Sequence, residues 1–149
     1  MKIAIGADHA GFPLKEELKG LLKEQNHLIM DAGTNGSDPV DYPDFVKDVV
    51  ENVLSGAADR GILICGSGIG MSIAANRYPG IRAALCLDPE TARLSRAHND
   101  SNVLVLVGRK TDVETARAIV NTWLSTGFEG GRHERRLKKI ETLITPFKT

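Results

Sequence analysis

The sequence has few of the residues and segments that mark several specialised classes of protein. Only two of its 149 residues are cysteine, Cys65 and Cys86, which is too few for a disulfide scaffold. Aromatic residues make up 5%, and Lys+Arg and Asp+Glu both number 19, so no overall charge attracts nucleic acid or an anionic membrane. No apolar run reaches the roughly 20 residues that span a bilayer, and the opening MKIAIG lacks the apolar stretch of a signal peptide. We therefore expect a cytoplasmic protein with no nucleic-acid or membrane partner, in which any anion site is built locally.

Short β-branched runs alternate with longer segments of helical periodicity, a pattern typical of a parallel sheet covered by helices. Several runs are apolar on both faces, as strands buried between two helical layers should be. Cys86 lies within such a run and is predicted to be a core residue only. The expected strands are Lys2–Gly6, His27–Gly33, Gly61–Gly66, Ile81–Leu87 and Asn102–Gly108. We predict a single domain over residues 1–149, with a three-layer Rossmann-like α/β fold of about five parallel strands flanked by helices.

Capping residues mark several expected helix starts. Asp41 is a predicted N-cap, the pair Asp88–Pro89 places proline at a first helical position, and Thr111–Glu114 has the capping-box pattern. A last, basic helix is expected from about Gly131 until Pro146 stops it.

Ligands of open parallel sheets bind beyond the carboxyl ends of the strands. Applied to the expected strands, this rule selects a small set of candidate site residues before any single motif is considered. They are Asp8–His9, Asp31–Thr34, Cys65–Gly70, Asp88 and Gly108–Arg109.

The stretch ILICGSGIGMSIAAN, Ile62 to Asn76, runs from a strand into a helix through three alternating glycines, Gly66–Gly70. Met71 stands where a dinucleotide fingerprint needs its third glycine and where a Cys-x5-Arg phosphatase needs arginine, and no Gly-Lys-Ser/Thr ending follows. What remains is a nest of backbone N–H groups for a small anion or a developing oxyanion. Such a position favours the thiolate of Cys65, and Ser67 adds a hydroxyl. The alternative is a tight turn in which Cys65 is a small buried hydrophobic residue.

The histidines near expected helix and strand ends each have two interpretations. Asp8 could orient His9 or share its proton, or it could only form a turn. Tyr42 could equally be a core residue or a ligand contact. His98 and Asn99 fit a helix C-cap, with asparagine in a left-handed turn, so His98 alone does not indicate catalysis.

The basic segment GGRHERRLKK carries a possible phosphate site. Arg132 and Arg136 are four residues apart, hence on one helix face, and two guanidinium groups there form a fork for phosphate; a solvated basic helix is the alternative. His133 and Arg135 fall on other faces and are expected to be solvated. No cluster has metal-ligand spacing, so we expect no metal.

Several motifs together resemble one enzyme family. DHAGF, DYPDF, GILICGSGIGMSIAANRYPGIRAAL, ARLSRAHNDSNVLVLVGR and GGRHERR closely resemble the ribose-5-phosphate isomerase B family, which belongs to a wider group with the galactose-6-phosphate isomerase subunits. The resemblance covers essentially the whole chain, with the motifs in the family's order and spacing.

The resemblance implies interconversion of D-ribose 5-phosphate and D-ribulose 5-phosphate through a cis-enediolate, in the pentose phosphate pathway and without metal or organic cofactor. It implies that Cys65 is the base and that Ser67 assists proton movement. His98 would open the furanose ring, with Asp8 near the ring oxygens. The substrate-binding residues that it implies are His9, Tyr42, Gly66, Gly68, Ile69, Gly70, Asn99, Arg109, Arg132 and Arg136. It further implies a homodimer or homotetramer whose sites draw residues from two subunits.

The chain departs from the family pattern at two places. Ser67 stands where threonine is frequent, which keeps the hydroxyl but holds it less rigidly. The polar stretch GRKTDVETA after Arg109 has no assigned function. Some members carry the base as a glutamate later in the glycine loop, and the absence of an acid there leaves Cys65 as the base.

Three other functions compete with this interpretation. The first is an isomerase for allose 6-phosphate or galactose 6-phosphate, although the galactose enzyme needs two different subunits and this chain carries both the base and the arginines. The second is a sugar-phosphate-binding protein without catalysis. The third is a Cys-nucleophile phosphatase, which the position of Met71 disfavours.

Overall fold

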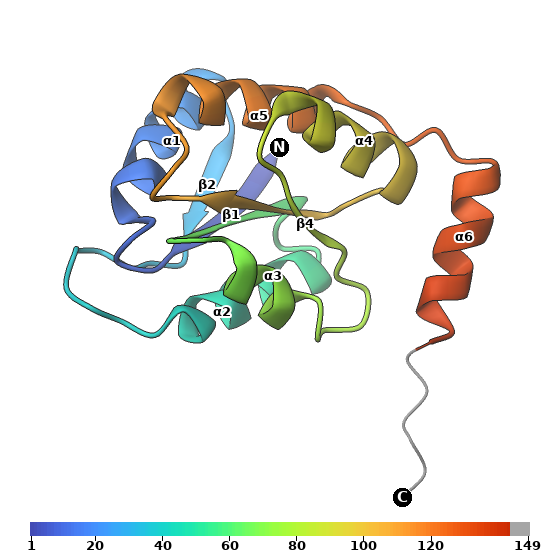
Figure 1. The fold of residues 1–149 in the computed structure, drawn as a ribbon, viewed down its shortest axis with the longest axis horizontal. Coiled ribbons are helices and arrows are strands. Elements are labelled where there is room, and N and C mark those ends of the chain that lie inside the picture. The colour runs from blue at the N-terminus through green and yellow to red at the C-terminus, as the bar shows by residue number, and fades with distance from the viewer. Residues whose placement is uncertain (144–149) are drawn as a thin grey trace, which may run out of the picture.

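A five-stranded parallel sheet forms the centre of the computed structural model, which describes residues 1–143 (Figure 1). The strands lie in the order β2-β1-β3-β5-β4, and each neighbouring pair is parallel. Their bounds are β1 Lys2–Ala7, β2 Leu28–Asp31, β3 Arg60–Cys65, β4 Ala83–Leu85 and β5 Val103–Val107. The predicted three-layer α/β fold with five parallel strands is confirmed.

Two layers of helices cover the sheet, and a sixth helix stands outside them. The helices are α1 Phe12–Glu24, α2 Tyr42–Leu54, α3 Ile69–Ala75, α4 Pro89–Asn99, α5 Val113–Ser125 and α6 Arg132–Glu141. Ile62 and Ile64 of β3 pack in the layer with α1, α4 and α5, whereas Leu63 and Cys65 pack against α2 and α3. Helix α6 packs beside α4 at the far end of the molecule (Figure 1). Among residues 1–143, no helix is both long and apolar enough to cross a bilayer.

The helix ends agree with the predictions in part. Asp88 accepts a hydrogen bond from the Thr91 N–H at 2.7 Å, as expected of an N-cap in front of a proline. The predicted capping box is one residue out of register, because Asp112 rather than Thr111 caps α5. Helix α6 ends at Glu141, before the predicted stop; Pro146 lies outside the described residues.

The topology places a switch point between β1 and β3. The chain leaves β1 for β2 on one side and then continues at β3 on the other side of β1. The two connections therefore diverge above the carboxyl ends of β1 and β3, where sheets of this type hold ligands. Asp8–His9 and the glycine loop follow these two strand ends directly.

Candidate active site

The thiol of Cys65 is held inside the glycine loop. Cys65 is the last residue of β3 and is 4% exposed, and its Sγ accepts a hydrogen bond from the Gly68 N–H at 3.2 Å. Gly68 has φ +74°, and a Cβ there would lie 2.5 Å from Leu85 Cδ1, so only glycine fits. A backbone N–H is therefore aimed at the sulfur, at the point where the loop leads into α3.

Two side chains from other elements occupy the space that the neighbouring glycines leave open. A Cβ on Gly66 would lie 3.2 Å from Arg109 Nε, and a Cβ on Gly70 would lie 2.5 Å from Tyr42 Cζ. Arg109 and Tyr42 therefore lie against the loop. Tyr42 is partly exposed at the start of α2 and is not a core residue.

A hollow of about 560 Å³ opens on the outer side of the glycine loop. Ser67 is exposed at its edge, and the Ser67 Oγ accepts a weak hydrogen bond from the Ile69 N–H at 3.3 Å. No function was expected for the polar stretch after Arg109, yet part of it forms a wall of this hollow. The lining residues are Gly66, Ser67, Ile69, Leu85, Leu87, Val107, Arg109, Lys110, Thr111, Asp112 and Thr115.

Asp8 and His9 each have a defined backbone partner. The Asp8 Oδ1 atom accepts hydrogen bonds from the N–H groups of Ala10 and Gly11, both at 2.9 Å, so its carboxylate forms a turn after β1. The His9 Nδ1 atom accepts a hydrogen bond from the Val40 N–H at 3.2 Å. In the neutral ring this places the proton on Nε2, and His9 presents a donor suited to a phosphate oxygen.

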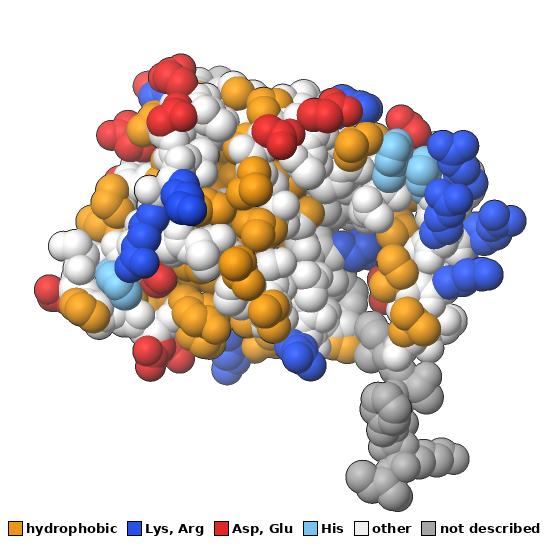
Figure 2. Space-filling view, in the orientation of Figure 1, with side chains coloured by type: hydrophobic (Ala, Val, Ile, Leu, Met, Phe, Trp, Pro, Cys, Tyr) orange, Lys and Arg blue, Asp and Glu red, His pale blue; other side chains and the backbone are white. Residues whose placement is uncertain are grey.

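His98, Asn99, Arg132 and Arg136 form a second group. His98 and Asn99 lie in the last turn of α4. The left-handed residue that ends this helix is Asp100, with φ 45°, and not Asn99, as the C-cap interpretation would require. Arg132 and Arg136 are exposed on α6, and Figure 2 shows basic side chains gathered over this helix.

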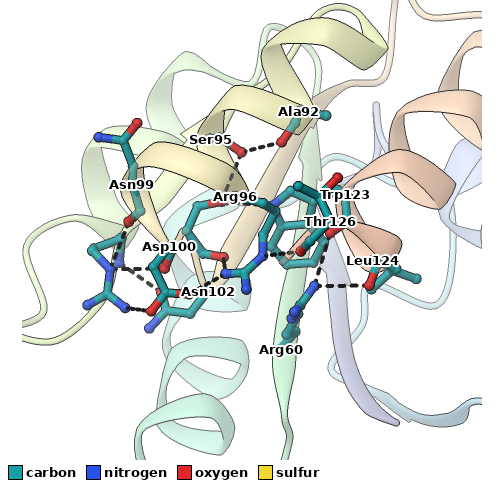
Figure 3. A network of polar contacts seen from close by, with 12 residues as sticks. Arg60, Ala92, Ser95, Arg96, Asn99, Asp100, Asn102, Trp123, Leu124 and Thr126 are labelled. Carbon is teal, nitrogen blue, oxygen red and sulfur yellow. Dashed lines mark hydrogen bonds and ion pairs between the residues drawn. The ribbon is translucent and has the colours of Figure 1, made fainter. Parts of the chain in front are cut away.

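A polar network holds the end of α4 in place (Figure 3). The Asp100 carboxylate accepts hydrogen bonds from Arg96 at 2.7 Å and from Arg82 at 3.0 Å. The Arg82 Nε–H group donates to the backbone oxygen of Asn99 at 3.1 Å, and Arg96 donates to that of Ser101 at 2.6 Å. Two guanidinium groups thus brace the turn that carries His98 and Asn99.

His133 is buried, which contradicts the prediction that it is solvated. It is 7% exposed, and its ring stacks on His98 with centroids 4.2 Å apart and planes 6° from parallel. The Nε2 atoms of both rings lie 3.7 Å from Glu129 Oε2. Burial, and then the positive charge of neighbours including His98 and Arg132, lowers the pKa of His133. Helix periodicity placed His133 away from the arginine face, but could not show that α4 covers that side.

The same three residues, among those described, are close enough to hold a metal ion, with all ligand atoms within 4.8 Å of one another. An imidazole nitrogen binds a metal in the plane of its ring. Because the rings of His98 and His133 are stacked in parallel, one ion cannot lie in both planes. The arrangement favours a stacked histidine pair beside one carboxylate over a chelating site.

The predicted site residues therefore fall into two groups at opposite edges of the sheet. Asp8, His9, Tyr42, Cys65 to Gly70 and Arg109 lie at the carboxyl edge, where Cys65 pairs with Val107. The end of α4 lies at the amino edge, because the helix runs back across the sheet before β5 begins; there the Asn102 side chain accepts a hydrogen bond from the Arg82 N–H. One chain does not bring His98, Asn99, Arg132 and Arg136 to the Cys65 loop.

Comparison with known proteins gives consistent matches over nearly the whole chain. The family model described as Ribose/Galactose Isomerase matches residues 3–140. The chain is 47% identical to ribose-5-phosphate isomerase B of Escherichia coli (strain K12), over 95% of each sequence. It is similar to the crystal structure of a ribose 5-phosphate isomerase from Thermotoga maritima (58% identity, TM-score 0.93, covering 95% of this chain and 97% of the other). It is also similar to ribose-5-phosphate isomerase B of Clostridium thermocellum (52% identity, TM-score 0.95, covering 96% and 97%).

Proposed function

This chain belongs to the ribose/galactose isomerase family, and we propose that it is an isomerase that interconverts D-ribose 5-phosphate and D-ribulose 5-phosphate. The names of its relatives from E. coli, T. maritima and C. thermocellum support this substrate. The observation that carries the proposal is the Cys65 thiol inside a loop of backbone N–H groups. Moving a proton beside a carbonyl needs a positioned base and donors for the oxyanion, and this loop has both.

The reaction begins with the open-chain aldose. The Cys65 thiolate takes the proton from C2, and the electron pair of that C–H bond forms the C1=C2 double bond of a cis-enediolate while the carbonyl oxygen becomes negative. The N–H groups of the glycine loop stabilise that charge, and the Ser67 hydroxyl moves a proton between O2 and O1. Return of the proton from Cys65 to C1 gives the ketose, so no net proton is gained or lost.

Binding energy comes from the phosphate, which is remote from C1 and C2. The Nε2–H group of His9 and the Arg109 guanidinium serve it from the carboxyl edge of the sheet. Arg132 and Arg136 add two guanidinium groups from α6. Tyr42, Asn99 and the backbone of Gly66 to Gly70 line the sugar, His98 opens the furanose ring, and Asp8 lies near the ring oxygens.

The active enzyme in this proposal is a homodimer, or a pair of dimers, with each site built from two chains. The support is the separation of the two residue groups, since no single chain unites them. An apolar surface over α3 fits such an interface (Figure 2). Its exposed members on α3 are Ile69 at 57% and Ile73 at 55%, and a contiguous exposed apolar patch marks a contact surface.

The proposal places the enzyme in the cytoplasm and in pentose phosphate metabolism. The two cysteines are both free and both buried, which suits a reducing compartment.

The direct test is ketose formation from ribose 5-phosphate in the presence of EDTA, with allose 6-phosphate assayed in parallel. Turnover insensitive to EDTA, lost in Cys65→Ala and kept in Cys86→Ala, is the expected result. Cys86 is the matched control because it is also buried and free but packs on the other face of the sheet from Cys65, in the layer with α1, α4 and α5. A Cys65→Ala enzyme with normal turnover overturns the mechanism. Faster turnover of allose 6-phosphate reassigns the substrate, and binding of both sugars without turnover indicates a non-catalytic binding protein.

A further inference from the structure

Glu129 and His133 both lie against the imidazole of His98. Glu129 follows α5 in the chain and lies against the end of α4, where its N–H donates to the Ala97 carbonyl at 2.9 Å. That backbone bond holds Glu129 beside the pair, and its Oε2 atom lies 3.7 Å from the Nε2 atoms of both rings. His133, buried on α6, covers one face of the His98 ring.

We propose that Glu129 and His133 are positioning residues for His98 in sugar ring opening: Glu129 keeps the proton on His98 Nε2, and the stacked His133 ring fixes the plane of the imidazole. This inference rests on the proposed function, because it assigns the support of a residue in that reaction. An ionised carboxylate can only accept hydrogen bonds, so an imidazole nitrogen that pairs with it carries a hydrogen. The other nitrogen, Nδ1, is then left with a lone pair to act as a base.

With its proton on Nε2, His98 can act as the base that opens the furanose ring. His98 Nδ1 takes the proton of the O1 hydroxyl, the O–H electron pair forms the C1=O bond, and the C1–O4 bond breaks with its electrons on O4. O4 takes a proton from water, and the imidazolium returns its proton to the hydroxide so formed. Glu129 stabilises the transient imidazolium, as an acid beside a catalytic histidine does in other enzymes.

Burial distinguishes the two stacked rings. Two imidazolium rings in face contact repel each other, so the stack disfavours a second positive charge. His133 is the more buried ring, and that burial lowers its pKa. The charged groups around the pair are Glu129, Glu90 and Arg93 on the side of α4, and Arg132 and Arg136 on α6.

The first test compares Glu129→Gln with Glu134→Gln. Glu134 is the matched control because it is an exposed acid on α6 whose carboxylate pairs with Lys138 at 2.9 Å, away from His98. With ribose 5-phosphate, we expect Glu129→Gln to lower kcat by roughly tenfold to a hundredfold, with KM little changed. The loss stays at or below the ~10² lower limit of what a positioned acid–base group itself contributes, because His98 is still present. Because ring opening then limits the rate, the isotope effect from deuterium at C2 falls toward 1. Glu134→Gln keeps the wild-type values.

The stacking role is tested at His133. His133→Phe keeps an aromatic ring against His98 and should retain most of the activity, whereas His133→Ala should lose it in the same way as Glu129→Gln. Equal losses in both His133 variants contradict a stacking role. If Glu129→Gln changes only KM, or leaves the isotope effect unchanged, the positioning role is wrong.

Nitrogen-15 NMR of the histidines in the unliganded protein separates this inference from the proposed function. We expect neutral His98 to carry its proton on Nε2 in the wild type, and to lose that preference in Glu129→Gln. A proton on Nδ1 in the wild type overturns the inference whatever the activity. If His98→Asn turns over ribose 5-phosphate at the wild-type rate, the proposed role of His98 in ring opening is wrong. The NMR result still decides whether Glu129 sets the tautomer of His98.

Discussion

Two inactive variants should restore each other's activity if each site is built from two chains. Strand β5, Val103–Val107, spans roughly 16 Å at about 3.3 Å per residue. Cys65 pairs with Val107 at one end of this strand, whereas His98 lies in the last turn of α4, shortly before the other end. This separation exceeds the length of a pentose phosphate, so Cys65 and His98 of one chain cannot serve the same substrate molecule.

The perturbation is to mix Cys65→Ala chains with His98→Asn chains. Random pairing makes half of the dimers mixed, and in each of these one of the two sites takes intact Cys65 from one chain and intact His98 from the other. About a quarter of all sites are then complete. Refolding an equimolar mixture and measuring ribulose 5-phosphate formation should recover about a quarter of the wild-type kcat, against little activity in either variant alone.

The control is a mixture of two variants whose substitutions both lie beside the glycine loop. Arg109 lies against the same glycine loop as Cys65, so Cys65→Ala mixed with Arg109→Ala leaves every site damaged and should recover nothing. If Cys65→Ala and His98→Asn also fail to complement, although native mass spectrometry detects the mixed dimer, the two-chain site is refuted.

Three further predictions concern stability and reactivity. Gly68→Ala should lower the free energy of unfolding by about 1–3 kcal/mol, because φ is +74° and the new Cβ meets Leu85. Gly127→Ala is the control and should change the urea midpoint little, because no atom lies within 4 Å of its new Cβ. Equal midpoints for the two variants would contradict the argument. Burial raises the pKa of Cys86 to about 11, so iodoacetamide at pH 8 should leave Cys86 unmodified in the folded protein. A carbamidomethylated Cys86 peptide in a tryptic digest of the treated protein would contradict this prediction. Burial acts to raise the pKa of Asp31, but hydrogen bonds from Lys15 and Lys19 outweigh it and hold that pKa below its ordinary value. The stability that Asp31 contributes is therefore present above its unfolded pKa of about 4 and is lost as the pH falls through the lower folded value. The urea midpoints of wild type and Asp31→Asn should differ at pH 7 and converge toward pH 2, and a constant difference would refute the coupling.

Much of the fold could be predicted because it depends on local pattern. Short β-branched runs that alternate with helical patterns located the five strands to within a few residues, and several of these runs are apolar on both faces, as strands between two helical layers must be. The end of α4 shows the limit of such reasoning. Asn99 and Asp100 both tolerate a left-handed turn, and Asp100 takes it because Arg82 and Arg96 hold its carboxylate. Those two arginines come from packing that no local pattern records.

The glycine loop, the cysteine at its mouth and the strand ends around them could be located from local residue patterns. Those features follow from neighbours in the chain: a strand must end before a helix begins, and φ +74° at Gly68 admits glycine almost alone. Which of the candidate residues contact one another depends on how the elements pack. Tyr42 and Arg109 reach the loop because the side chains missing from Gly70 and Gly66 leave them room.

His98 and His133 are 35 positions apart in the numbering, and α6 packing on α4 brings their rings together. The separation of the two groups of candidate residues also depends on topology. Each crossover helix runs back along the parallel sheet, so it ends near the amino ends of the strands, opposite the strand end from which it started. Sequence patterns extend over one or two turns of a helix, whereas the two groups of residues are separated by the full length of the sheet along its strands.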